Sequence, residues 1–84
     1  MEYRYVIDCD VAETLVRLPA RQREDLIRAF RFLAANPSQR GESSFKDSTL
    51  RDIQKKQFGR WVISFWADQP VEELRIVGVQ VHKL

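Results

Sequence analysis

The segment Phe58–Asp68, with the sequence Phe-Gly-Arg-Trp-Val-Ile-Ser-Phe-Trp-Ala-Asp, constrains the fold more than any other part of the chain. Apolar side chains occupy both alternating sets of positions, with Trp61, Ile63 and Phe65 in one set and Val62 and Trp66 in the other. Because a strand turns alternate side chains to opposite faces, this segment needs cover on both faces. Aromatic and β-branched residues favour strands, so residues 60–67 are predicted to form the central strand of a small sheet.

Length and composition point to one small domain, residues 1–84. Hydrophobic residues make up 44% of the chain and charged residues 31%, a mixture that is typical of globular proteins and argues against disorder. No run approaches the roughly 20 apolar residues of a membrane span, and the first residues do not form a signal peptide. We therefore expect no membrane association. Cys9 is the single cysteine, which excludes an internal disulfide and a cysteine-based zinc site and favours a reducing cytoplasm.

The net charge does not identify a partner. Fourteen Lys and Arg residues against 12 Asp and Glu residues leave a formal charge of only +2. A nucleic-acid partner would therefore require the basic residues to be concentrated on one face of the molecule.

The first half of the chain predicts a strand and two helices. Tyr3–Asp8 alternates as a strand. Asp10 is placed as the N-cap of a helix that runs from Val11 to Leu18. Leu26, Ile27, Phe30, Leu33 and Ala34 recur at helical spacing, which predicts a second helix over Ala20–Ala35.

The second half predicts a polar loop over Ser38–Thr49 and three strands. A polar strand is expected over Leu50–Phe58, followed by the central strand and a last strand over Glu73–His82. In the last strand, one face is expected to carry Leu74, Ile76, Gly78, Gln80 and His82. The predicted fold is α+β in the order β-α-α-β-β-β, with the helical hairpin packed on one face of the sheet.

This order, over nearly the whole chain, resembles the RelE/ParE superfamily of toxins from type II toxin–antitoxin systems. The resemblance rests on Leu18-Pro19 between the helices, Leu33-Ala-Ala-Asn-Pro37 at the end of the second helix, Gly59-x-Trp61 before a Val-Ile-Ser-Phe strand, and Ile76-Val-Gly78 near the end. It implies an antiparallel sheet with a helical hairpin on one face. It also implies a cognate antitoxin that wraps the domain with a helix and an extended segment.

The resemblance further implies a chemistry. Members of the RelE type cut messenger RNA in the ribosome without a metal or other cofactor, using arginines and lysines. In this family an arginine commonly follows the aromatic residue of the central strand, where this chain has Val62. A second arginine commonly follows the glycine of the last strand, where this chain has Gln80, and the usual C-terminal tyrosine is missing.

The densest basic cluster comprises Arg51, Lys55, Lys56 and Arg60, and with Gln80 it is the candidate nucleic-acid-binding patch. An edge strand protected by lysines would give the same pattern. Lys55, Lys56 and His82 are the candidate catalytic residues, although a solvated terminal histidine would explain His82 equally simply. Trp61 and Trp66 are expected on opposite faces, one beneath the helices and the other able to stack on a base.

Two functions remain open. The chain is a toxin component that inhibits translation through ribosome-dependent cleavage of messenger RNA, or it is a non-enzymatic binding module on the same fold. The second class includes ParE-like inhibitors of DNA gyrase and degenerate toxins that act only through their protein partner. A third hypothesis is an RNA-binding domain without toxin activity. It predicts tight, salt-sensitive RNA binding and no effect on growth.

Overall fold

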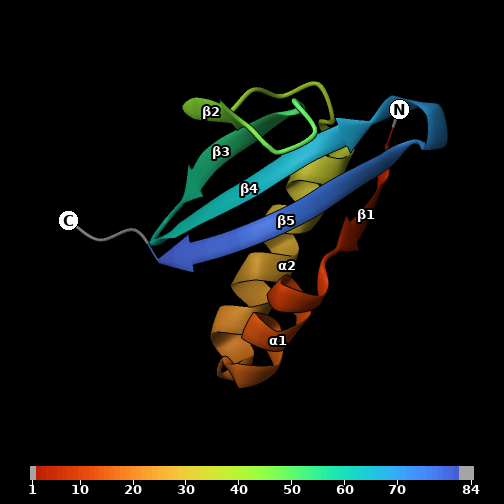
Figure 1. The fold of residues 1–84 in the computed structure, drawn as a ribbon. Coiled ribbons are helices and arrows are strands. Elements are labelled where there is room, and N and C mark those ends of the chain that lie inside the picture. Colours follow the sequence, from red (N-terminus) through yellow and green to blue (C-terminus); the bar gives the residue numbers. More distant parts are fainter. Residues whose placement is uncertain (1, 82–84) are drawn as a thin grey trace.

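A five-stranded sheet carries both helices on one of its faces (Figure 1). The computed structural model describes residues 2–81. The strands lie side by side in the order β1-β5-β4-β3-β2. The elements are β1 (Arg4–Ile7), α1 (Cys9–Arg17), α2 (Ala20–Ala35), β2 (Ser43–Lys46), β3 (Asp52–Phe58), β4 (Trp61–Asp68), a 3-10 turn (Gln69–Val71) and β5 (Glu73–Val81). The predicted α+β class and order are confirmed, with one short strand added.

β4 is the central strand, as predicted, and pairs antiparallel with β3 and β5. Its side chains Trp61, Ile63 and Phe65 are buried beneath the helices. The alternate side chains of β4, which include Val62 and Trp66, are only partly buried. The second face is covered less completely than the first: no helix among the described residues lies on it (Figure 1), but Arg51 lies over Trp66 there, and Ile53 on this face is buried.

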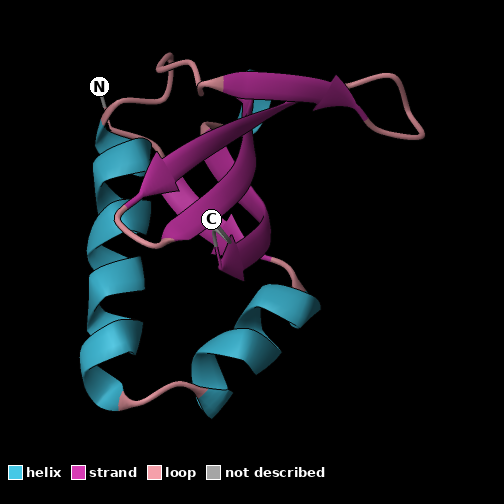
Figure 2. Cartoon of the chain, turned by 90° about the vertical axis from the view of Figure 1, so that its left-hand side faces the viewer, coloured by secondary structure: helices cyan, strands magenta, loops and turns pink. Residues whose placement is uncertain are grey.

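The core lies between this sheet and the two helices. It is formed by Val11 and Leu15 of α1 and by Leu26, Phe30 and Leu33 of α2. The two helices meet at residues 18–19 and diverge as a V (Figure 2). No helix among the described residues is long and apolar enough to cross a membrane.

The sheet is mixed rather than purely antiparallel. β1 pairs in parallel with β5, and Tyr5 lies opposite Leu74 in this register. Tyr5 faces the helices, where its ring lies 5.7 Å from that of Phe30. Strands joined by a tight turn must be antiparallel, but β1 and β5 are separated by most of the chain. Local patterns therefore carry no signal for the direction of this pairing.

β2 lies where a polar loop was expected, and it pairs antiparallel with β3. Gly41 precedes it at a point where the chain approaches β3 closely. A Cβ at this position would lie 2.1 Å from the backbone oxygen of Lys55. The Gly41 N–H donates a hydrogen bond to Oε1 of Gln54 at 3.0 Å. A glycine is therefore required for the segment to lie against β3.

α1 begins earlier than predicted. Its N-cap is Asp8, whose side chain makes no capping hydrogen bond, and Asp10 lies inside the first helical turn. A carboxylate in this first turn still interacts favourably with the helix dipole. The predicted capping role of Asp10 is wrong.

A bulge in β5 changes which residues share a face. Ser64 lies opposite Gly78, but the next residue, Phe65, lies opposite Ile76, so Val77 is an extra residue in β5. An extra residue shifts the alternation by one position. Gln80 therefore does not share a face with Leu74 and Ile76, contrary to the prediction, and His82 lies outside the described residues.

Candidate nucleic-acid interface

The face of β3, β4 and β5 that carries no helix is the candidate site, and we call it the open face. Strand register brings two rows of residues together on it. One row contains Lys55, Ser64 and Gly78, and the other contains Gln57, Val62 and Gln80. Residues directly opposite each other in antiparallel strands place their side chains on the same face. Lys55 and Gln80 therefore lie on the same side of the sheet, as the sequence hypothesis requires.

Two cation–aromatic pairs lie on the open face. The guanidinium carbon of Arg51 is 4.2 Å from the ring centroid of Trp66. The ammonium nitrogen of Lys55 is 5.1 Å from the ring centroid of Phe45, a side chain that is 43% exposed. Both distances fall within the roughly 6 Å at which an aromatic ring attracts a cation. Cations for phosphates and aromatic rings for bases are thus interleaved on one surface.

Asp47 fixes the position of Arg51. One oxygen of Asp47 accepts hydrogen bonds from the hydroxyl of Thr49 at 2.7 Å and from the backbone N–H of Arg51 at 3.0 Å. The other oxygen pairs with Nε of Arg51 at 3.2 Å. These donors lower the pKa of Asp47 from 3.8 to about 2, so the carboxylate is charged throughout the physiological range. The loop therefore presents Arg51 over Trp66 in a defined orientation.

Lys55 and Lys56 point to opposite faces of β3. Lys56 lies opposite Ile63, which is fully buried beneath the helices, so Lys56 is on the helix side. Its ammonium pairs with Glu42 at 3.2 Å. The pKa of Glu42 is lowered first by the backbone N–H of Gln57 and then by Lys56. Among the described residues, no carboxylate lies within 4.0 Å of the Lys55 ammonium, so its charge is available to a ligand.

Arg60 also lies away from the open face. It occupies the two-residue turn between β3 and β4, after Gly59, whose φ is +58°. Its guanidinium lies 5.4 Å from the ring of Trp61, which belongs to the buried core on the helix side. The basic cluster expected from sequence is therefore divided between the two sides of the sheet. Arg51 and Lys55 lie on the open face, and Lys56 and Arg60 lie on the helix side.

Val62 and Gln80 lie directly opposite each other in the register of β4 and β5. The two positions where the family resemblance leads us to expect arginines are thus neighbours on the open face. Neither carries a charge in this chain. Any stabilisation of negative charge on this surface must come from other residues.

Two residues of the open face were not identified from sequence as candidates. Arg75 lies opposite Trp66, and its guanidinium is 3.7 Å from a carboxylate oxygen of Glu73. The alternation of Arg75 with the core residues Leu74 and Ile76 was a usable signal for its direction. Phe45 was assigned to a loop, because nothing in the polar segment around it predicts the strand that directs its ring toward Lys55.

Comparison with known proteins supports the fold. No protein-family model matches the sequence, and a search of curated proteins also found no match. Two solved structures are similar over almost the whole chain. A chain of the archaeal RelE–RelB complex from Pyrococcus horikoshii OT3 matches with a TM-score of 0.73 and 17% identity, covering 96% of each chain. A chain of the toxin–antitoxin complex RelBE2 from Mycobacterium tuberculosis matches with a TM-score of 0.79 and 18% identity, covering 98% of this chain and 93% of that one.

These likenesses define the class of structure: the chain has a RelE-like toxin fold. The resemblance to the RelE/ParE superfamily that the sequence motifs suggested is confirmed at the level of the fold. At 17% and 18% identity, the match concerns the backbone and its topology rather than particular site residues.

Proposed function

We propose that this protein is the toxin component of a type II toxin–antitoxin system, and that its partner is an antitoxin encoded beside it. The observation that carries this proposal is the extent of the fold similarity. Nearly the whole chain superimposes on chains from two structures described as RelE–RelB and RelBE2 toxin–antitoxin complexes. The motifs at Leu18-Pro19, residues 33–37 and residues 76–78 independently led to the same class.

The open face supports RNA as the target of the toxin. Lys55 makes no ion pair among the described residues, and Arg51 is held over Trp66, so both cations can approach phosphates. Phe45 is exposed enough to stack on a base. Sequence-specific RNA recognition usually uses single-stranded segments, whose unstacked bases can lie on such aromatic rings.

Cleavage would proceed by attack of a ribose 2′-hydroxyl on the adjacent phosphorus, with the 5′-oxygen of the next nucleotide as the leaving group. Negative charge develops on the phosphate oxygens during this attack, and positioned cations stabilise it. Lys55 is the described residue best placed for this role, with Arg51 as a second cation. His82, which lies outside the described residues, remains the candidate acid or base.

A second candidate function is binding without cleavage. It is favoured by the opposed pair Val62 and Gln80, which removes two expected cations from the middle of the open face. A module of this kind would act through DNA gyrase or only through its protein partner. It would retain the fold and the antitoxin-binding surface without ribonuclease activity.

The test is tightly induced expression of the wild-type protein in a bacterial host, with growth and messenger-RNA integrity followed together. Growth arrest with cuts in translated messages, each leaving a 5′-hydroxyl end, is the result expected for ribosome-dependent cleavage. Arrest with intact messages and an SOS response would assign the gyrase-directed function instead. Unimpaired growth, with folded protein shown to accumulate, would contradict the toxin assignment.

A further inference from the structure

The Trp66 end of the open face carries two arginines that come from different elements. Arg51, just before β3, lies over the indole with its guanidinium carbon 4.2 Å from the ring centroid. Arg75, on β5, lies directly opposite Trp66 in the register of β4 and β5. Side chains opposed in this way share a face of the sheet and have Cβ atoms about 5 Å apart. Trp66 is therefore bordered by one cation on its β3 side and another on its β5 side.

Both guanidiniums keep donors for a ligand. The side chain of Arg51 is 43% exposed and that of Arg75 is 38% exposed. Arg51 uses its Nε for Asp47 and Thr49, at 3.2 and 3.0 Å, and its two terminal nitrogens make no hydrogen bond with the described residues. A guanidinium has five N–H donors in a fixed fork, which suits the oxygens of a phosphate. Arg51 is thus held in place by one edge and free at the other.

Glu73 leaves the charge of Arg75 available. One of its carboxylate oxygens accepts a hydrogen bond from the guanidinium of Arg4 at 2.7 Å. The other oxygen lies 3.7 Å from the guanidinium of Arg75, which is longer than a hydrogen bond. Because Arg4 makes the close contact with this carboxylate, Arg75 keeps its donors for another anion.

Two carboxylates mark the outer limit of this cationic region. Asp68 lies opposite Glu73 in the last pair of β4 and β5. Each is two residues from the pair of Trp66 and Arg75, so both belong to the open face. Their charges repel a phosphate backbone that would continue past this end of the sheet. A polyanion bound at Trp66 is therefore directed back toward Lys55.

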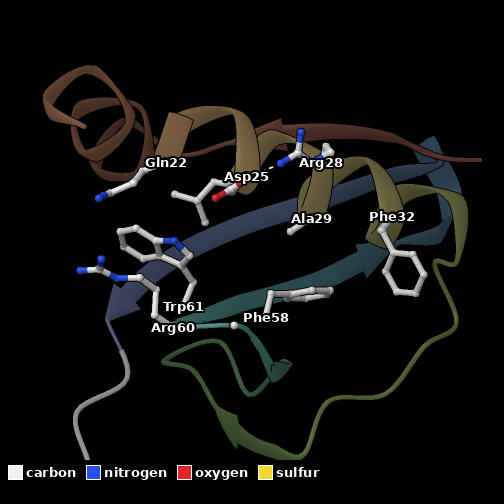
Figure 3. A pocket seen from close by; sticks show the side chains of 10 residues that line it. Gln22, Asp25, Arg28, Ala29, Phe32, Phe58, Arg60 and Trp61 are labelled. Carbon is white, nitrogen blue, oxygen red and sulfur yellow. Dashed lines mark hydrogen bonds and ion pairs between the residues drawn. The ribbon is translucent and has the colours of Figure 1, made fainter. Parts of the chain in front are cut away.

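The helix side of the sheet cannot contribute to this region. There, a groove of about 480 Å³ separates α2 from the turn between β3 and β4, and we call it the α2–hairpin groove (Figure 3). Figure 3 shows the exposed side chain of Phe32 at one end of the groove and Arg60 with Trp61 at the other. Because the sheet lies between this groove and the open face, Arg60 does not reach a phosphate held at Trp66.

We propose that Arg51 and Arg75 together hold one phosphate of a single-stranded RNA beside Trp66, in a subsite separate from Lys55. The proposal rests on the RNA target proposed above. Hydrogen bonds from two guanidiniums to one phosphate are charge-assisted and therefore stronger than bonds between neutral groups. With Lys55 as the second contact, the RNA crosses the strands in the direction from β5 to β3. The phosphate-binding centre of the open face is thus at its Trp66 end.

The experiment measures binding of a fluorescein-labelled RNA hexanucleotide of mixed sequence by fluorescence anisotropy at several salt concentrations. Arg51→Gln and Arg75→Gln are each expected to weaken binding by roughly threefold to tenfold. The double variant is expected to lower the slope of log K against log salt by about 0.7, which corresponds to one phosphate contact. Its loss of affinity should be smaller than the product of the two single losses, because both arginines hold the same phosphate. Since both side chains are half-exposed, all variants should fold, which thermal unfolding will check.

Arg21→Gln is the matched control, because it removes the same charge from an exposed arginine of α2, on the helix side. It is expected to bind RNA like the wild type. Unchanged binding by Arg51→Gln and Arg75→Gln, or an equal loss in Arg21→Gln, would overturn the subsite while leaving the RNA target intact. A slope lowered by about 1.4 in the double variant would show two separate phosphates and overturn the shared one. If the wild type does not bind RNA at all, the proposed RNA target itself is contradicted.

Discussion

The open face and the α2–hairpin groove lie on opposite sides of the same two strands, and their chemistry differs sharply. The open face presents Lys55 and Arg51 beside aromatic rings. The groove presents exposed aromatic side chains with a basic residue at one end. The alternation of side chains along a strand explains how β3 can contribute to both surfaces, because Lys55 and Lys56 are adjacent in sequence but face opposite ways. A basic cluster in the sequence is therefore not one basic patch in space.

The segment at Gly41, which lies against β3, is expected to be the most sensitive to mutation. Gly41→Ala would place a Cβ 2.1 Å from the backbone oxygen of Lys55, so the segment must move away from the strand. We expect a loss of about 1–3 kcal/mol in the free energy of unfolding, measured by urea denaturation. RNA affinity should fall as well, because this segment positions Phe45 and Arg51.

Gly78→Ala is the matched control for this substitution. A Cβ at Gly78 would make only ordinary contacts of 3.6 Å with Ser64. Because alanine is less costly than glycine in a strand, stability should stay the same or rise by about 0.5 kcal/mol. A large loss of stability in this control, or none in Gly41→Ala, would show that close approach to β3 is not what requires a glycine at position 41.

Lys55→Ala and Lys56→Ala should separate the two sides of the sheet. Binding of a single-stranded RNA oligonucleotide, followed by fluorescence anisotropy at several salt concentrations, should weaken only for Lys55→Ala. Loss of one phosphate contact should reduce the slope of log K against log salt by about 0.7. Lys56→Ala should instead remove the half-exposed pair with Glu42, worth about 1 kcal/mol of stability, and the contact of the ammonium with the Phe58 ring. Equal loss of RNA affinity in both variants would argue that the two lysines form one site.

Protonation of Asp47 should produce the smallest effect on the open face. The pKa of Asp47 is about 2 in the folded protein and 3.8 ordinarily, so its interactions stabilise the fold above pH 3.8. That contribution is lost as the pH falls through about 2. Titration of the Asp47 carboxyl by NMR should show the low midpoint and simultaneous shifts at Arg51 and Trp66. A midpoint near 3.8 would contradict the hydrogen bonds that hold Arg51 in place.

Much of the fold was predictable because strong local patterns specify it. The apolar spacing of α2 and the aromatic alternation of β4 predicted both elements, and α2 has the bounds that were expected. The short strand β2 was not predictable, because Ser43–Lys46 has four exposed residues and no apolar alternation. The parallel pairing of β1 with β5 depends on tertiary packing, which a local pattern does not encode.

The site was predictable only in part. Lys55 and Arg51 were among the candidates and do lie on one face, while the alternation of β3 removes Lys56 from it. The bulge at Val77 placed Gln80 on the open face, and the adjacent Gly78 was the available signal, because an isolated glycine inside a strand often marks a bulge. Arg75 was missed, although its alternation with the core residues Leu74 and Ile76 was the available signal for its place on the open face.

Growth of a bacterial host that expresses this protein, alone or with the product of the adjacent reading frame, tests the division between the two sides of the sheet most directly. The wild type should arrest growth alone and be neutralised by the adjacent product. Lys56→Ala should arrest growth as strongly as the wild type, whereas Lys55→Ala should lose toxicity. Undiminished toxicity of Lys55→Ala, or lost toxicity of Lys56→Ala, would contradict the assignment of separate roles to the open face and the helix side of the sheet.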